Sequence, residues 1–321
     1  MARRLSLQCV VVFSGPALLC VAGLLYGAWS WPSLRERLTP SPTADGTSVT
    51  YSLTINHDQG RMGNKLFKYA SLLGLARTHG RHAFVNPYKE DLDMAKVFNL
   101  THVEKHSEIS RWPLIEEKNY ATVDDVFKKL PPTNVRLRGY VQSWRYFDAI
   151  KDEIRREFQF LPKHRSMAEE FRGKLLQDVK NGSDTVVVVG VHVRQRDQKS
   201  LPNTTVAPAS FYRNAFLKMR SLLPGRRLVF VVSSNDLPWC EENLRQPDTV
   251  VVQPAPPDQH FAILATSDHM IVSAGSYGWW AGWLTGGHVI YYKRFPLPES
   301  FEAKGFVHDD YYPPSWIPVD H

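Results

Sequence analysis

The twelve residues VVVVGVHVRQRD, from Val186 to Asp197, decide the fold of this chain. The first six are five valines and one glycine, an apolar run that is typical of a central strand in a parallel sheet. The other six include one histidine, two arginines and one aspartate. Because α/β proteins place their ligands at the carboxyl ends of parallel strands, this stretch predicts a ligand site at the end of a buried strand.

Strand-like and helix-like runs alternate on both sides of this stretch. After it we expect strands at 227–232, 249–252, 269–273 and 288–292, and helices at 209–223, 237–245, 258–268 and 278–286. Before it we expect strands at 49–55, 83–85 and 135–141, and helices at 65–80, 147–158 and 166–179. This alternation predicts an α/β protein with a doubly wound parallel sheet, whose strand-end loops converge.

Composition excludes several classes of protein. The chain has 321 residues, of which 43% are hydrophobic and 22% charged, as in ordinary globular proteins. Its net charge of +7 is scattered without a block of like charges, which argues against nucleic-acid binding and fits the attraction of a small anion. Two of the three cysteines lie in the first 20 residues, so no disulfide framework and no zinc spacing is present.

The N-terminus is apolar, with no charged residue for 27 positions from Leu5 to Trp31. That length exceeds the roughly 20 residues needed to cross a bilayer. We therefore expect a cytoplasmic tail at 1–6, a signal-anchor transmembrane helix at 7–31, and a Pro/Ser/Thr-rich stem at 32–48. A cleaved signal peptide is the alternative.

Three glycosylation sequons support a body that lies in the lumen of the secretory pathway. They begin at Asn99, Asn181 and Asn203. Single tripeptides of this kind arise by chance, but three of them after an apolar anchor together predict that the body lies in this lumen.

Two glycine-containing turns and an arginine pair carry the expected anion chemistry. GRMGNK, at Gly60–Lys65, and SAGSYG, at 273–278, each follow a strand and precede a helix, whose N-terminus offers N–H donors. A simple tight turn is an equal alternative for the first.

Arg194 and Arg196 could hold phosphate oxygens through their guanidinium forks, and a solvated loop is the alternative. In SSND, at 233–236, Asn235 or Asp236 could simply cap the next helix.

The DLD triplet at 91–93 has the Asp-x-Asp spacing that often holds a divalent metal. It lies far in sequence from the expected phosphate site and directly before a helix-like run. We therefore interpret these acids as residues of a helix's first turn, and predict neither a metal site nor a cofactor.

Six segments together resemble one known family, the galactoside α-1,2-fucosyltransferases of glycosyltransferase family 11. Their sequences, in chain order, are GRMGNKLFKYASLLGLAR, GYVQSWRYF, VGVHVRQRD, SSNDLPWCEENL, FAILATSDHMIVSAGSYGWWAGWLTGG and PPSWIPV. The resemblance covers the body from about Asp58 to Pro318. Enzymes of this family move L-fucose from GDP-fucose to the 2-hydroxyl of a terminal galactose.

The resemblance implies a GT-B-like pair of Rossmann-like domains: an acceptor-side domain at 49–180, and a GDP-fucose-binding domain with a C-terminal extension at 181–321. It implies an inverting, metal-independent transferase of class EC 2.4.1, whose partners are GDP-fucose, a β-galactoside and, through one helix, a membrane. The expected location is the Golgi membrane, with single-pass type II topology and the body in the lumen.

The resemblance also assigns roles to residues. Arg194 matches the arginine that holds the β-phosphate as GDP departs. Asp197 is the second catalytic candidate, and because it lies so close to two arginines we expect it to act as a structural tether rather than as a general base. The other residues matched to the donor site are His192, Arg61, Gly63, Asn64, Asp258, Ser276, Tyr277 and Gly278. Trp144, Arg145 and Tyr146 are expected on the acceptor side, because aromatic faces suit sugar rings, and burial of the tryptophan in a core is the alternative.

Three positions depart from the family pattern. Gln195 replaces the motif's second arginine, Lys65 replaces a glutamine, and His260 stands where an acid commonly precedes Phe261. Two alternative functions therefore stay open. One is a protein O-fucosyltransferase, and the other is a catalytically silent luminal glycan-binding protein.

Overall fold

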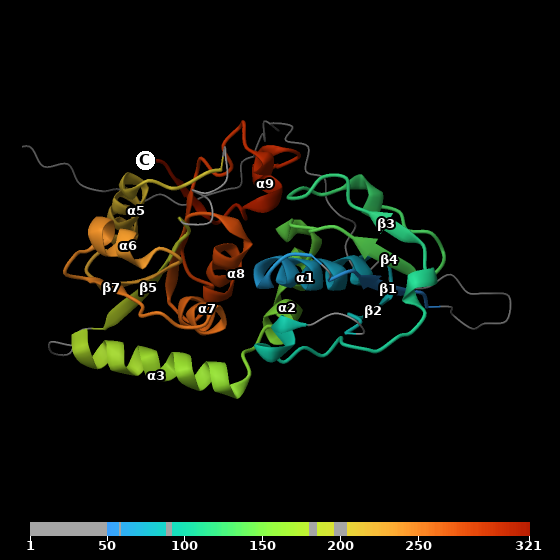
Figure 1. Ribbon diagram of the computed structural model, residues 1–321, viewed down its shortest axis with the longest axis horizontal. Coiled ribbons are helices and arrows are strands. Elements are labelled where there is room, and N and C mark those ends of the chain that lie inside the picture. The colour runs from blue at the N-terminus through green and yellow to red at the C-terminus, as the bar shows by residue number, and fades with distance from the viewer. Residues whose placement is uncertain (1–49, 58, 88–91, 180–184, 196–203) are drawn as a thin grey trace, which may run out of the picture.

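The computed structural model describes residues 50–57, 59–87, 92–179, 185–195 and 204–321. Two parallel β-sheets lie side by side in it, each packed against helices (Figure 1). This arrangement confirms the predicted α/β fold with parallel strands. The expected tail, signal anchor and stem lie outside the described residues, and none of the helices within those ranges is long and apolar enough to span a membrane.

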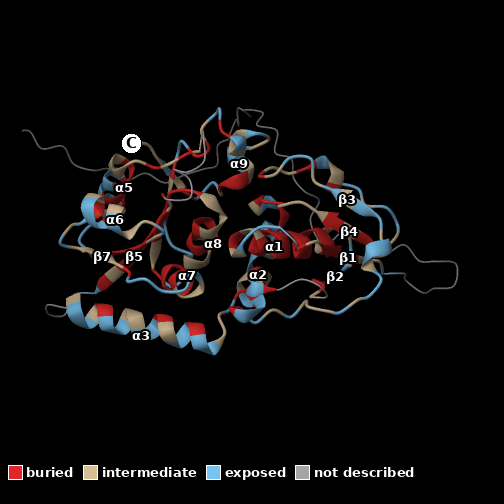
Figure 2. Ribbon diagram, in the orientation of Figure 1, coloured by how far each residue is buried: buried red, intermediate tan, exposed pale blue. Residues whose placement is uncertain are grey.

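The first half contains a four-stranded parallel sheet in the order β2-β1-β4-β3. Its strands are β1 (Ser52–Ile55), β2 (His82–Ala83), β3 (Leu114–Glu116) and β4 (Val135–Arg138). Its helices are α1 (Met62–Thr78) and α2 (Lys151–Glu157), with 3-10 turns at Asp93–Lys96, Ile109–Arg111, Asp125–Phe127, Trp144–Tyr146 and Asp148–Ile150. Figure 2 shows that most of α1 is buried, because one face lies on the sheet and another on the second half.

The second half contains a six-stranded parallel sheet in the order β10-β9-β8-β5-β6-β7. Its strands are β5 (Val186–Val193), β6 (Arg227–Ser234), β7 (Thr249–Val251), β8 (His269–Val272), β9 (Val289–Tyr292) and β10 (Ile317–Val319). Its helices are α3 (Pro162–Val179), α5 (Ala209–Leu222), α6 (Leu237–Leu244), α7 (Pro257–Ala265), α8 (Gly275–Thr285) and α9 (His308–Tyr311), with a 3-10 turn at Phe301–Ala303.

The valine run forms a central strand, as predicted. β5 pairs with β6 along its full length and with β8 on its other side. All of its residues except Val187 are buried. The strand therefore ends in the interior, and it delivers His192 and Arg194 to the edge where the two halves meet.

The two halves share one continuous aromatic core. The ring of Phe67, on α1, lies 4.5 Å from the ring of Trp279 and 5.1 Å from that of Trp280, both on α8. Phe147 stacks on Trp280 at 5.3 Å. Because these large side chains are buried together, α1 and α8 are fixed relative to each other.

The C-terminal segment connects the second half back to the first. The Asp310 carboxylate accepts hydrogen bonds from Thr122 Oγ1 and the Val123 N–H, both at 2.9 Å, and pairs with Arg145 at 2.7 Å. Trp144 Nε1 donates to the carbonyl of Asp309 at 3.0 Å. In Figure 1 this segment, with α9, lies above the junction of the halves.

Candidate functional site

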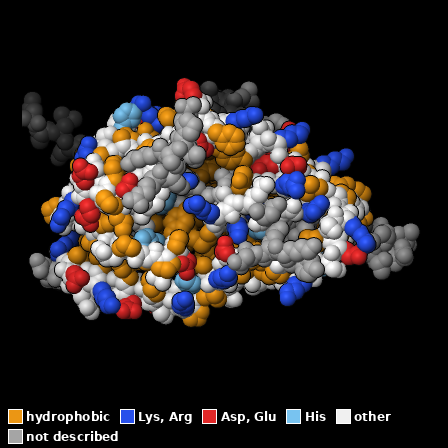
Figure 3. All heavy atoms as spheres, in the orientation of Figure 1, with side chains coloured by type: hydrophobic (Ala, Val, Ile, Leu, Met, Phe, Trp, Pro, Cys, Tyr) orange, Lys and Arg blue, Asp and Glu red, His pale blue; other side chains and the backbone are white. Residues whose placement is uncertain are grey.

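A cleft of about 1200 Å³ opens between the two halves. The first half lines it with the turn at 60–64 and with Asp93, Lys96 and Val97; the second half lines it with the ends of β5 and β6 and the starts of α6, α7 and α8. Figure 3 shows apolar side chains inside this hollowed face and basic side chains beside it. The residues matched to the donor site that line the cleft are Arg61, Gly63, Asn64, His192, Arg194, Asp258, Ser276 and Tyr277.

The N-termini of α1 and α8 meet at one end of the cleft. Ser276 Oγ, in the first turn of α8, donates a hydrogen bond to Asn64 Oδ1, in the first turn of α1. Gln142 Nε2 donates to the same oxygen at 2.8 Å. Gly63 permits this approach, because a Cβ there would lie 2.5 Å from the backbone nitrogen of Tyr277. Two helix N-termini, each with N–H groups that lack helical partners, are suited to an anion, and we call this part of the cleft the anion-binding end.

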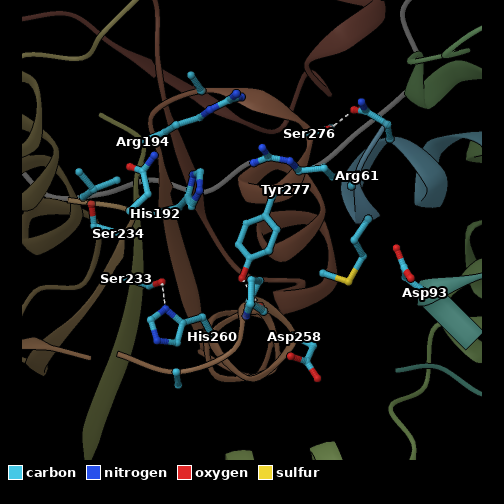
Figure 4. Close-up of a pocket in the computed structure, with 18 of the residues that line it drawn as sticks. Arg61, Asp93, His192, Arg194, Ser233, Ser234, Asp258, His260, Ser276 and Tyr277 are labelled. Atoms are coloured by element: carbon cyan, nitrogen blue, oxygen red, sulfur yellow. Dashed lines mark hydrogen bonds between the residues drawn. The ribbon is translucent and has the colours of Figure 1, made fainter. Parts of the chain in front are cut away.

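Arg194 adds a permanent positive charge beside these helix ends. Its N–H donates to Ser273 Oγ at 3.1 Å, which fixes the backbone after β5. Its guanidinium passes over Gly275, whose φ of +81° favours glycine and where a Cβ would lie 2.5 Å from Nη1. In Figure 4 Arg194 and Arg61 lie on the side of the cleft where Ser276 lies. This end of the cleft is therefore suited to a phosphate or diphosphate.

His192 lies between the anion-binding end and the rest of the cleft. The residue is 8% exposed, and its ring lies 5.3 Å from the ring of Tyr277. Gly278 does not line the cleft. It makes room for His192 instead, because a Cβ there would meet the histidine's Nδ1 at 2.4 Å. Tyr277 donates to the carbonyl of Pro257 at 2.5 Å, and burial, reinforced by the charge of Asp258, raises the pKa of the tyrosine.

The opposite end of the cleft combines apolar walls with a few polar groups. His260 Nε2 lies 3.0 Å from the carbonyl of Gln253, which can only accept, so this nitrogen carries a proton. Its Nδ1 lies 2.8 Å from Ser233 Oγ. The apolar wall residues are Leu237, Pro238, Pro254, Ala255 and Pro257. Such an end suits a flat heterocycle that bears polar groups on its edge.

The residues expected on the acceptor side do not line the cleft. Tyr146 is buried, and its hydroxyl bonds the N–H of Asp124 at 2.7 Å and the carbonyl of Thr122 at 3.2 Å, so the structure places this residue in the core instead. Arg145 lies over the ring of Trp144 at 5.0 Å and is paired with Asp310. Both residues hold the C-terminal segment against the first half.

Other predicted positions lie outside the described residues, namely Arg196, Asp197, Asn181 and Asn203. The remaining sequon asparagine, Asn99, is exposed. Asp236 caps α6 by accepting from the N–H of Trp239, as the simpler interpretation of SSND predicts.

Two departures from the family pattern have structural explanations. Gln195 is 1% exposed, and its Nε2 donates to the carbonyl of Ala207 at 2.9 Å. This side chain therefore points away from the cleft. Lys65 pairs with Asp93 at a distance of 3.2 Å.

The expected position of the DLD triplet needs correction. Asp91 lies outside the described residues. Asp93 lies in the first turn of a short helix, as predicted, but it also lines the cleft, so its distance in sequence from the phosphate site does not separate it from that site in space. Distance along the sequence was misleading because α1 brings this segment of the first half against the second. Within the described ranges, no group of three or more His, Cys, Asp or Glu side chains is arranged to hold a metal ion.

Comparisons with known proteins identify the family. The family described as "Glycosyl transferase family 11" matches residues 31–320. A pig protein named galactoside alpha-(1,2)-fucosyltransferase 2 is 33% identical over 304 residues, which cover 91% of this chain and 86% of the relative. Human galactoside alpha-(1,2)-fucosyltransferase 1 is 31% identical, over 95% of this chain and 82% of the relative. This chain belongs to glycosyl transferase family 11.

Solved structures of other fucosyltransferases are more distant from this family 11 chain. The fucosyltransferase NodZ from Bradyrhizobium shares 13% identity, with a TM-score of 0.48, over 73% of this chain and 93% of that one. A structure of POFUT1 in complex with GDP shares 11% identity, with a TM-score of 0.46, over 78% of this chain and 96% of that one.

One residue at this family 11 site, Gln142, was not predicted from the sequence. Gln142 donates directly to Asn64, although the two residues are 78 positions apart. Its only sequence signal is its place inside the segment GYVQSWRYF, in which the aromatic residues drew attention instead.

Proposed function

We propose that this chain transfers L-fucose from GDP-fucose to the 2-hydroxyl of a terminal β-galactoside, with inversion and without a metal ion. The observation that carries this proposal is the cleft end where Arg194 and the N-termini of α1 and α8 converge. Membership of family 11 supports the identity of the donor and the acceptor, because the relatives are named galactoside alpha-(1,2)-fucosyltransferases.

The cleft suits GDP-fucose along its length. The apolar end that contains His260 and Asp258 would take the guanine, since it combines flat apolar walls with polar groups at the edge. The end that contains Arg194, Asn64 and Ser276 would take the diphosphate. The fucose would then project beyond the diphosphate, toward the acceptor.

Arg194 would contribute most to the chemical step. Breaking the bond between the fucose C1 atom and the phosphate oxygen builds positive charge on the sugar, as in glycoside hydrolysis, and negative charge on the leaving diphosphate. A fixed guanidinium, with N–H donors already aimed at that diphosphate, stabilises charge that grows in the transition state. These groups would stabilise the leaving diphosphate in the way that a divalent cation does in metal-dependent enzymes.

Inversion requires the galactose 2-hydroxyl to attack C1 from the side opposite to the departing diphosphate. The first half would hold the acceptor beyond the N-terminus of α1, because Arg194 and α8 of the second half supply most of the groups proposed to hold the donor. The domain limits 49–180 and 181–321 are part of this proposal, although α3, at the end of the first range, packs against α7 and the sheet of the second half.

The buried position of Gln195 bears on the silent glycan-binding alternative. The absence of an arginine at position 195 would explain a loss of activity only if the side chain at that position faced the donor. Its side chain instead bonds the carbonyl of Ala207 inside the second half. The glutamine side chain therefore takes part in the interior packing of the second half, and Arg61 and Arg194 are the arginines that line the cleft among the described residues.

We also propose that the chain is a Golgi type II membrane protein whose body lies in the lumen. The charge-free stretch 5–31 and the exposed sequon at Asn99 support this topology. Endoglycosidase treatment of the protein from a eukaryotic host tests it. A shift in electrophoretic mobility that Asn99→Gln reduces is the expected result, and a protein without glycans would contradict a luminal body.

Transfer from GDP-fucose tests the proposed activity. The full chain is incubated with GDP-fucose, EDTA and either lactose or a folded acceptor domain for protein O-fucosylation, and the product linkage is read by NMR. We expect fucose on O2 of the galactose of lactose. Fucose on a serine or threonine hydroxyl would instead identify a protein O-fucosyltransferase, and hydrolysis without transfer would contradict both.

A further inference from the structure

Gln142 does not line the cleft, yet its side chain reaches a group that does. It follows β4, is 6% exposed, and places its Nε2 at 2.8 Å from Asn64 Oδ1. Asn64 lies in the first turn of α1 and lines the anion-binding end of the cleft. A polar contact therefore runs from the interior of the first half to the expected position of the diphosphate.

The direction of this hydrogen bond decides what Asn64 can offer a ligand. A side-chain amide has an acceptor oxygen and a donor nitrogen of nearly equal size, so its partners determine which group points where. Asn64 Oδ1 accepts from Gln142 Nε2 and from Ser276 Oγ. With its oxygen occupied in this way, the amide keeps its Nδ2 donor for an anion.

A strained turn holds Gln142 in place. Val141, the preceding residue, has a φ of +46°, in the left-handed region that β-branched residues avoid. The Glu117 carboxylate accepts from the N–H groups of Tyr140 at 2.7 Å and of Val141 at 3.0 Å. Ser71 Oγ donates to the carbonyl of Val141 at 2.8 Å. Backbone strain of this kind persists only where several surrounding contacts hold the chain in one conformation, as these hydrogen bonds do.

We propose that Gln142 is a positioning residue for the sugar nucleotide: it holds the Asn64 amide with its Nδ2 group available to the diphosphate. Gln142 itself touches no ligand in this arrangement and acts through Asn64. The inference rests on the proposed function, and it adds a residue outside the cleft that sets the affinity for the donor.

Gln142→Glu tests the direction of the bond, with Gln142→Ala as its companion. The glutamate places an acceptor opposite Asn64, which favours the flipped amide and turns Oδ1 toward the phosphates. Binding of GDP to the full chain is measured by titration calorimetry, without any turnover. We expect the Kd for GDP to rise about tenfold or more for Gln142→Glu, because a hydrogen bond to a charged group is replaced by repulsion. The alanine variant should show a smaller rise.

A double-mutant cycle separates positioning from general destabilisation. Each Gln142 variant is repeated in an Asn64→Ala background, where a residue that acts through Asn64 has no further effect on GDP binding. Asn86→Ala is the matched control, since Asn86 is also a buried amide of the first half, bonded to the backbone of His106, and does not line the cleft. It should lower thermal stability and leave the Kd for GDP unchanged.

The outcomes distinguish this inference from the proposed function. The inference is overturned if both Gln142 variants bind GDP as the wild type does, or if their losses persist undiminished in the Asn64→Ala background. Equal losses of GDP affinity for the glutamate and alanine variants would also overturn it, because the direction of the hydrogen bond to Asn64 would then not matter. A wild-type protein that binds GDP in this Gln142-dependent way but transfers no fucose would contradict the proposed function alone.

Discussion

Gly63→Ala should damage the site by pushing apart the two helix N-termini that form it. An added Cβ would lie 2.5 Å from the backbone nitrogen of Tyr277 and 2.6 Å from the carbonyl carbon of Ser276. Ordinary contact begins at 3.4 Å, so the helices must separate by 3.4 minus 2.5, or 0.9 Å. Both clashing atoms belong to the backbone, so no side-chain rotation can relieve the contact.

The expected effect on activity exceeds the effect on stability. A misplacement of about 1 Å can reduce turnover roughly 100-fold, whereas overpacking costs about 1–3 kcal/mol of unfolding free energy. We therefore predict a fall of about two orders of magnitude in kcat/KM for GDP-fucose, with a loss of only a few degrees in Tm. Steady-state fucosyl transfer and calorimetric melting of the same preparation measure both quantities.

Gly173→Ala, in α3, is the matched control, because an added Cβ there meets nothing within 4 Å. Alanine in a helix interior should stabilise that variant by roughly 0.5–1 kcal/mol, without a change in kcat/KM. If Gly63→Ala kept kcat/KM within about twofold of the wild type, the contact between the two helix ends could not be what shapes the site.

Three further predictions concern separate parts of the molecule. Burial raises the pKa of Glu117 from 4.5 to about 7, so the native state binds this proton more tightly than the unfolded chain does. Relative to Glu117→Gln, the wild type should lose on the order of 3 kcal/mol of unfolding free energy as the pH rises from about 4.5 to 7. If the unfolding free energies of the two proteins, measured by denaturation, changed in parallel with pH, this expectation would be wrong. Asp310→Ala removes an acceptor of two hydrogen bonds and a partner of Arg145, so urea unfolding should show a loss of about 3 kcal/mol. A loss below about 0.5 kcal/mol would exclude a fastening role for the C-terminal segment. Gly278→Ala would place a Cβ 2.4 Å from His192 Nδ1. It should weaken GDP binding about tenfold in calorimetry, and unchanged binding would show that the histidine ring is not needed in its present place.

Regular elements with strong local patterns could be predicted from the sequence. The valine run predicted β5 as a central strand, and the alternation that follows it predicted most of the second sheet. The strands that were missed, β3 and β10, have three residues each and lie at sheet edges, where only one side is paired and little apolar pattern is needed. Helix α8 begins at Gly275 rather than at Gly278, because the glycine turn forms its first turn.

The residues of the candidate site were predictable from local pattern at strand ends and glycine-containing turns, and otherwise only from the family resemblance. His192 lies at the end of β5 and Arg194 directly follows it, and the topology of parallel sheets predicts that they face a ligand. The contact between Asn64 and Ser276 joins residues 212 positions apart, and it depends on how the two halves pack. The same packing brings Asp93 to the cleft. Tyr146 is buried by contacts within the first half, with Thr122, Asp124 and Phe127, which no local pattern indicates either.

Fucosyl transfer by the wild type and by Arg194→Ala, with lactose as acceptor and EDTA present, tests the account most directly. The wild type should form the 2-linked fucosyl product without added metal. The variant should keep its Tm and lose about two to three orders of magnitude in kcat, the cost typical of removing a donor that stabilises developing negative charge. A variant with kcat near that of the wild type, or a wild type that is inactive until a divalent metal is added, would contradict the role assigned to Arg194.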